Sequence, residues 1–180
     1  MLKHKKNNSD FIEKIFGNAE EKYFKKGEII SPIGLIHQHF YYVEKGFVRI
    51  YFLDSKGNEI TQWFSDKGDM AGILSSFVKG QSSIYCMEAL EDTVLKVISK
   101  EKFEEIRKTT PAVQESLMNM LIEITLHLSD KLIETRVKTA KERYEKLLKE
   151  YPTIFQKASL GHIATYLGIT QQSLSRIRAN

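Results

Sequence analysis

The distribution of glycine divides this chain into two parts with different patterns of secondary-structure signals. Seven of its ten glycines lie between residues 27 and 80, whereas residues 81–160 contain none. From about residue 20 to 98, short runs of aromatic and β-branched residues alternate with turn signals about every 10–12 residues, which is typical of an antiparallel sandwich or barrel. The sequence therefore predicts an α+β fold: an antiparallel β-roll of the jelly-roll or cupin-like type (residues 1–108), a long helix (109–136) and a small all-α domain (137–180).

Helix start signals flank the strand-rich part. Asp10 suits the N-cap of a short helix over residues 10–17, with Glu13 as its capping-box partner. Ser99 is a suitable N-cap for a helix that ends near residue 108. Thr110, followed by a proline, suits the start of the next and longest helix.

Apolar residues recur in the long helix at spacings of four, three, four and four, which is a coiled-coil-like pattern. Such a stripe predicts a second helix alongside, contributed either by this chain or by a second copy of it. The stripe consists of Leu117, Leu121, Ile124, Leu128 and Leu132. A further amphipathic helix follows over residues 140–148 and ends before Pro152.

The net charge of +4 belongs to the end of the chain. Residues 1–137 contain 19 basic and 20 acidic residues, whereas residues 138–180 contain 8 and 3. This asymmetry favours an anionic partner for the tail, with a solvated basic face as the alternative. No apolar run is longer than four residues and the N-terminus has no apolar core, so we expect a cytoplasmic protein with no membrane partner. The single cysteine, Cys86, excludes an intrachain disulfide and is expected to be a buried strand residue.

Residues 159–179 have the spacing of a helix-turn-helix. Ser159 and Thr170 are suitable N-caps for its two helices, a small residue stands where the helices must approach, and a glycine follows four residues later at the sharp turn. An ordinary helical hairpin is the alternative. The residues predicted to form the shared core and turn are Ile163, Ala164, Leu167, Gly168, Ile169, Leu174 and Ile177.

The second of these helices has side chains suited to DNA. Glutamine amides pair with adenine and arginine guanidinium groups with guanine in the major groove, while hydroxyls at a helix start suit phosphates. For the two arginines, a solvated helix end is the alternative. The predicted DNA-contacting residues are Gln171, Gln172, Ser175, Arg176 and Arg178, with Thr170 and Ser173 at the helix start.

These parts together resemble the Crp/Fnr family of bacterial transcription regulators. The resemblance rests on the segments Tyr41–Arg49, Lys67–Gly72, Glu88–Asp92 and Leu174–Arg178. It implies a cyclic-nucleotide-binding-like roll that senses an effector, a long helix that forms a homodimer, and a second tail helix that reads double-stranded DNA. RNA polymerase is a candidate partner. We predict no enzymatic activity, because no nucleophile–base–acid group stands out from the sequence, and no bound cofactor. The chain is expected to be a short form without the β-wing that often follows.

The sequence departs from the nucleotide-binding members of that family at two places. Where those members have a glutamate for the ribose, this chain has Ile73. Where they have an arginine for the cyclic phosphate, it has Gln81-Ser82-Ser83. A buried phosphate without a cation is costly, so we expect no tight binding of cyclic AMP and an unknown effector instead. The predicted effector pocket comprises Gly72, Ile73, Leu74, Ser82 and Ser83.

Two alternative functions remain open at this point. His37, His39 and Glu44 have the spacing of cupin metal ligands, which would indicate a metal-binding protein or metalloenzyme. The same segment also fits the entry to a strand of the roll, which requires no metal, and we predict none. The third possibility is a signalling adaptor whose roll binds a ligand and whose tail binds no DNA.

Overall fold

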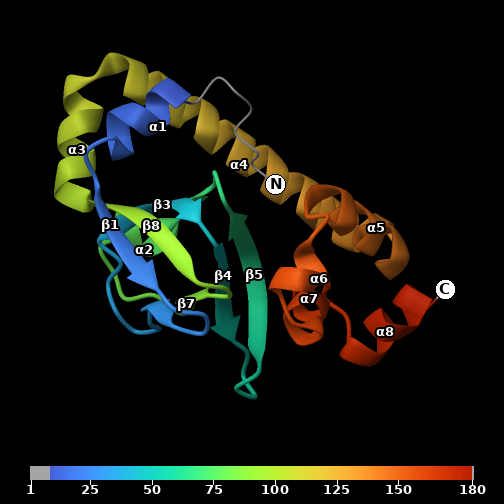
Figure 1. Ribbon diagram of the computed structural model, residues 1–180. Helices are drawn as coiled ribbons and strands as arrows, with labels where there is room; N and C mark the ends of the chain where they lie inside the picture. Colours follow the sequence, from blue (N-terminus) through green and yellow to red (C-terminus); the bar gives the residue numbers. More distant parts are fainter. Residues whose placement is uncertain (1–8, 180) are drawn as a thin grey trace.

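The computed structural model describes residues 9–179, and shows a strand-rich unit and a helical unit connected by one long helix (Figure 1). The N-terminal stretch of residues 1–8, used above for the absence of a signal sequence, and Asn180 lie outside the described residues. All strand pairs are antiparallel. The predicted α+β fold with a β-roll is therefore confirmed.

The roll consists of two four-stranded sheets with the orders β1-β8-β3-β6 and β2-β7-β4-β5. The buried side chains of Val43, Val48, Met87 and Leu95 lie between them in one cluster. The strands are β1 (Glu20–Phe24), β2 (Ile29–Ser31), β3 (His39–Lys45), β4 (Phe47–Leu53), β5 (Glu59–Asp66), β6 (Met70–Ala71), β7 (Tyr85–Ala89) and β8 (Thr93–Ser99).

Four helices surround the roll: α1 (Ser9–Phe16), α2 (Leu74–Lys79), α3 (Lys100–Thr109) and the start of α4 (Pro111–Val137). Ser99 caps α3 as predicted, since its hydroxyl accepts from the Lys102 amide at 3.3 Å. One predicted cap is wrong, because Asp10 lies inside α1, where its carboxylate accepts from Lys14 Nζ at 2.6 Å. Thr110 is the N-cap residue of α4 and a proline follows it, as predicted, but the Thr110 side chain makes no capping hydrogen bond.

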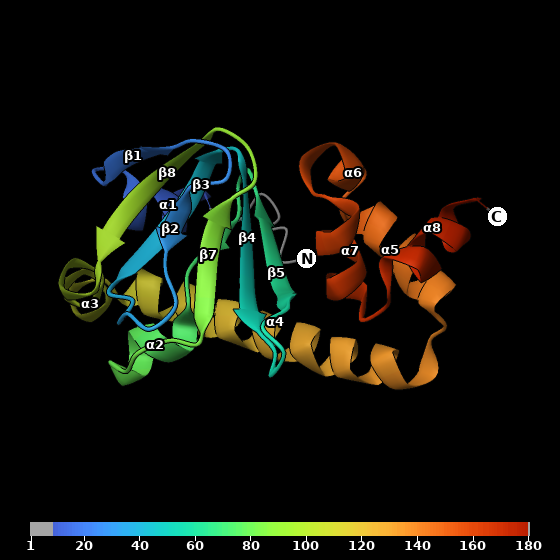
Figure 2. The same cartoon turned by 90° about the horizontal axis from the view of Figure 1, so that it is seen from below.

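The helical unit consists of α5 (Ala140–Glu150), α6 (Ile154–Lys157), α7 (Leu160–Leu167) and α8 (Gln171–Ala179). Helix α4 runs beneath both units and joins them (Figure 2). The expected boundaries at residues 108/109 and 136/137 fall beside the ends of α3 and α4. The helical unit shares its core with the roll, because Phe47, Phe64 and Leu90 of the roll belong to the same buried cluster as Leu147, Ile163 and other residues of the helical unit.

Candidate nucleic-acid interface and ligand cavity

Helices α7 and α8 are joined by a tight turn over residues 168–170. Ser159 caps α7 by accepting from the His162 amide at 3.1 Å. Gly168 has φ +67°, the left-handed conformation that ends α7, and the Ile169 amide then donates to the Ala164 carbonyl at 3.0 Å. Thr170 Oγ1 accepts from the Ser173 amide at 3.1 Å at the start of α8. The local geometry is that of a helix-turn-helix.

The residues predicted to form the core of this motif come together. Ile163, Ala164, Leu167 and Leu174 are buried, and Ile169 packs against the same cluster. Ile177 is half-buried. The apolar sides of both helices therefore pack into the buried cluster, and one face of α8 is left exposed to solvent.

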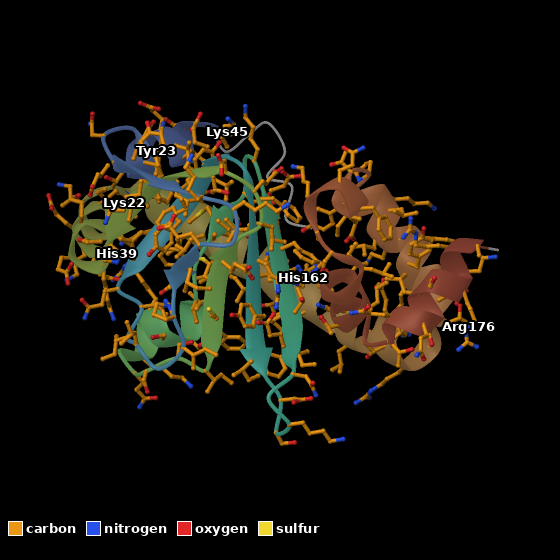
Figure 3. All side chains as sticks on the ribbon, turned by 60° about the horizontal axis from the view of Figure 1, so that its bottom comes forward. Lys22, Tyr23, His39, Lys45, His162 and Arg176 are labelled. Carbon is orange, nitrogen blue, oxygen red and sulfur yellow. The ribbon has the colours of Figure 1, made fainter. Side chains whose placement is uncertain are left out.

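That exposed face carries the polar residues expected to contact DNA. Gln171, Gln172, Ser175 and Arg176 are exposed, and Figure 3 shows Arg176 on the side of the helical unit away from the strands. Arg178 is also exposed, but its guanidinium lies 4.3 Å from the centre of the Phe155 ring. The side-chain amide of Gln171 lies against Gly161 of α7.

The hydroxyls at the start of α8 are engaged within the protein. Thr170 is exposed and Ser173 half-buried, and Thr170 Oγ1 donates to Ser173 Oγ at 3.0 Å besides accepting from its amide. The pair forms the helix cap. It leaves the first free amides of α8, rather than the two hydroxyls, as the more available donors for a phosphate.

Helix α7, the first of the pair, is docked on strand β5 of the roll. Thr165 Oγ1 accepts from the Thr61 amide at 3.2 Å and bonds to its hydroxyl at 3.1 Å. The Tyr166 ring packs against Phe64 with centroids 5.1 Å apart, and the Tyr151 hydroxyl donates to the Phe64 carbonyl at 3.0 Å. No sequence pattern predicted this contact between segments about a hundred residues apart.

Charged groups frame the same junction. Lys157 pairs with Asp66 at 2.6 Å and with Glu91 at 3.4 Å. The ammonium of Lys131 on α4 lies 4.0 Å from the Tyr166 ring centre and donates to the Gln62 carbonyl at 3.1 Å. Burial lowers the pKa of Lys131 to about 8.

A buried arginine lies under the docked helix. Arg49 on β4 is 1% exposed, pairs with Glu59 and with Glu88 at 3.3 Å, and lies 4.1 Å from the Tyr51 ring centre. His162 of α7 lies between the roll and the helical unit (Figure 3), and its buried Nδ1 has no hydrogen-bond partner within residues 9–179. Burial, together with the positive charge of Arg49, lowers the pKa of His162 to about 4.

The predicted apolar stripe of α4 is covered by the roll only over its first part. Leu117 packs on the cluster under α1 and α3, and Ile124 faces the roll. Leu121 is half-buried, whereas Leu128 and Leu132 are 44% and 56% exposed. The helix is apolar on two sides, so the stripe is split between the roll and solvent. The other exposed apolar residues of α4 are Met118, Ile122, Leu126, Ile133 and Val137.

A cavity of about 560 Å³ lies between the roll and α4. Gly72, Ile73 and Leu74 of the predicted effector pocket line it. Ser82 and Ser83 do not: Ser82 pairs with Ile36 in a β-bridge, and Ser83 Oγ accepts from the Tyr85 amide at 2.8 Å. The other lining residues are Phe40, Ile50, Gln62, Trp63, Ser65, Asp69, Met70, Ala71, Ser75, Val78, Lys79, Tyr85, Met120, Ile124, Leu128 and Tyr151.

The histidines proposed as metal ligands have other contacts. His37 is buried and hydrogen-bonded to the Ser31 hydroxyl, His39 lies on β3, and Glu44 pairs with Lys96 at 3.7 Å. Among residues 9–179, no group of three or more His, Cys, Asp or Glu side chains is placed to hold a metal ion. Cys86 is buried on β7 as predicted, and burial raises the pKa of its thiol.

Comparison with known proteins agrees with this architecture. The family described as the cyclic nucleotide-binding domain matches residues 21–110. The chain belongs to this family. No curated protein matches the chain. No helix in the described part of the chain is long and apolar enough to cross a membrane.

Solved structures extend the similarity into the helical unit. FixK2 from Bradyrhizobium japonicum is 27% identical with a TM-score of 0.77, covering 89% of this chain and 83% of its own. A transcriptional regulator of the CRP/FNR family from Thermus thermophilus is 20% identical with a TM-score of 0.68, covering 89% of this chain and 84% of its own. The catabolite activator protein of Thermus thermophilus is 19% identical with a TM-score of 0.61, covering 95% and 82%. The resemblance to Crp/Fnr regulators predicted from the sequence is confirmed.

Proposed function

We propose that this protein is a homodimeric, sequence-specific DNA-binding transcription regulator of the Crp/Fnr type, with an effector other than cyclic AMP. The observation that carries the proposal is the orientation of α8. Its apolar side is buried, and Gln171, Gln172, Ser175 and Arg176 are exposed to solvent. Arg176 lies on the side of the helical unit away from the strands (Figure 3). A helix of this kind fits the major groove, where these side chain types distinguish base pairs.

The dimer part of the proposal is supported by the outer side of α4. Seven large apolar residues of this one helix are exposed: Met118, Ile122, Leu126, Leu128, Leu132, Ile133 and Val137. A second copy of the helix packed against this side would remove these residues from water. The two copies of α8 would then be related by a two-fold axis. Such a pair matches a palindromic operator with half-sites about 34 Å apart.

The first experiment is selection of bound sequences from a random DNA pool. We expect enrichment of a two-fold palindrome. Arg176→Ala should cost roughly 1–3 kcal/mol of binding free energy and relax the specificity at one base pair. Arg178→Ala is the matched control, because that guanidinium is already stacked on Phe155, and it should leave the base preference intact. A pool without enrichment would favour a signalling adaptor that binds no DNA, and a loss equal for all sequences would reduce Arg176 to a phosphate contact.

The second experiment tests the dimer by sedimentation. Ile122→Glu introduces a charge at a side chain that is 50% exposed on the outer side of α4, so we expect a monomer. Leu53→Glu introduces the same charge at a side chain that is 49% exposed at the end of β4, and it should remain a dimer. A wild-type monomer at micromolar concentration would contradict the proposal. Contact with RNA polymerase remains a prediction for a later transcription assay.

A further inference from the structure

The cavity between the roll and α4 has an almost entirely apolar lining. Only two of its lining residues carry a full charge at neutral pH, Asp69 and Lys79. The Asp69 carboxylate accepts from the Asp66 amide at 2.9 Å within the β5–β6 turn. Lys79 is exposed at the end of α2. Among the polar side chains, the Ser65 hydroxyl donates to the Met70 carbonyl at 3.3 Å.

This lining is unsuited to a nucleotide. A phosphate enclosed by protein needs cationic or multiple hydrogen-bonding partners, because its desolvation is otherwise uncompensated. Within residues 9–179, no buried cation lines the cavity, and the carboxylate of Asp69 would repel a phosphate. The side chain at the position of the family's ribose-binding glutamate, Ile73, is buried and apolar.

The volume and the mouth of the cavity fit a small organic molecule. About 560 Å³ lies within the usual range for pockets that enclose drug-sized ligands, roughly 300–1,000 Å³. At its edge, Val78 and Leu128 are 66% and 44% exposed although both line the cavity. An apolar ligand therefore meets apolar side chains both at the entrance and inside.

We propose that this cavity binds a largely apolar small molecule, neutral or with a single acidic group, in place of a cyclic nucleotide. Only the regulatory meaning of this binding rests on the proposed function; the binding itself does not. The ligand would contact Met120, Ile124 and Leu128 of α4 and Tyr151 of the helical unit, whose hydroxyl is bonded to the Phe64 carbonyl. It would therefore touch all three parts of the protein.

The chain carries its own reporter for a test. Trp63 is the only tryptophan and lines the cavity. We would titrate the full chain, without DNA, with the neutral fluorescent probe N-phenyl-1-naphthylamine and follow the quenching of Trp63 emission. The expected result is saturable quenching with a dissociation constant on the order of 10 µM, and no displacement of the probe by millimolar cyclic AMP.

Two variants separate cavity binding from adsorption on the surface. Leu128→Asp places a carboxylate in the cavity wall, whereas Ile84→Asp places one at a side chain of the roll that is 65% exposed and does not line the cavity. We expect at least tenfold weaker probe binding for Leu128→Asp and unchanged binding for Ile84→Asp, with circular dichroism confirming that both fold. Val78→Asp, at an exposed position on the rim of the cavity, should also weaken probe binding. It keeps the test valid if Leu128→Asp does not fold.

Displacement by decanol and by decanoate distinguishes neutral from acidic ligands. Lys79→Ala should weaken displacement by decanoate alone if the acidic group is recognised, and should change neither if the ligand is neutral. Absence of saturable quenching, equal loss in the Ile84 and Leu128 variants, or displacement of the probe by micromolar cyclic AMP would each overturn the proposal. None of these results depends on DNA, so failure of this proposal and failure of the proposed regulator function are distinguishable.

Discussion

Protonation of His162 should weaken the folded state between pH 7 and pH 5. The His162 side chain lies where α7 docks on the roll, near Arg49, and its pKa is lowered from 6.5 to about 4. Because the folded-state pKa is below the unfolded-state pKa, the unfolded chain binds more protons between these values. The stabilisation is therefore fully present above pH 6.5 and is lost as the pH falls toward 4.

The size of the effect follows from the two pKa values. Linkage between 6.5 and about 4 gives a loss of about 1.8 kcal/mol in the free energy of unfolding on going from pH 7 to pH 5. His162 is only half-buried, so solvent screening reduces this upper value to about 1 kcal/mol.

The assay is urea denaturation at pH 7 and pH 5, followed by far-UV circular dichroism and Trp63 fluorescence. Burial also lowers the pKa of His37 and His127. In the wild type, several groups therefore contribute to the pH dependence of the free energy of unfolding. His162→Gln removes one of them and should lose about 1 kcal/mol less than the wild type between the two pH values. Gln172→Asn, an exposed neutral change, should keep the wild-type slope. If His162→Gln keeps that slope as well, the docking of α7 does not desolvate this imidazole.

Three further outcomes are expected from the packing. Leu174→Ala empties a fully buried position between the two helices of the motif and should destabilise the protein by roughly 2–5 kcal/mol in urea denaturation. Gly46→Ala should cost roughly 2–5 kcal/mol in the same assay, because φ at Gly46 is +104° and the new Cβ would lie 2.7 Å from Thr93 Cα. Gly57→Ala is the control: φ there is +81° and the space around it is open, so it should cost only about 1–2 kcal/mol. Cys86 is buried and burial raises its thiol pKa, so a thiol reagent should modify it far more slowly in the folded protein than in urea; comparable rates would contradict its burial.

Local patterns predicted the helix-turn-helix well because its determinants are close together in the sequence. Ser159, Gly168 and Leu174 lie within sixteen residues, and capping, a left-handed turn and helical periodicity each act over one or two turns. The docking of α7 on the roll was not predictable in this way. Its contacts join Thr165 to Thr61 and Tyr166 to Phe64, and no periodicity links residues so far apart.

Only three of the five residues predicted for the effector pocket line the cavity, because the pairing of the other two with a distant segment leaves no local sequence signal. Gly72, Ile73 and Leu74 were placed in it through a family pattern. Ser82 and Ser83 were placed there by the position of a missing arginine, but the chain uses them to pair the segment with residues 34–36.

Helix α4 shows why a single apolar stripe was an incomplete description. A sequence with apolar residues on two sides of a helix fits several heptad registers, and spacing alone does not say which side is covered by the same chain. Leu128 lies at the boundary, since it lines the cavity and is 44% exposed. A ligand in the cavity and a second copy of α4 on its outer side would both contact this residue. Ligand binding and dimer geometry would therefore be coupled through this one side chain, without a long chain of intermediate contacts. Leu128→Met keeps the volume and polarity of the side chain, so ligand binding and dimerisation should each remain measurable on their own. The variant should alter the effect of ligand binding on dimerisation.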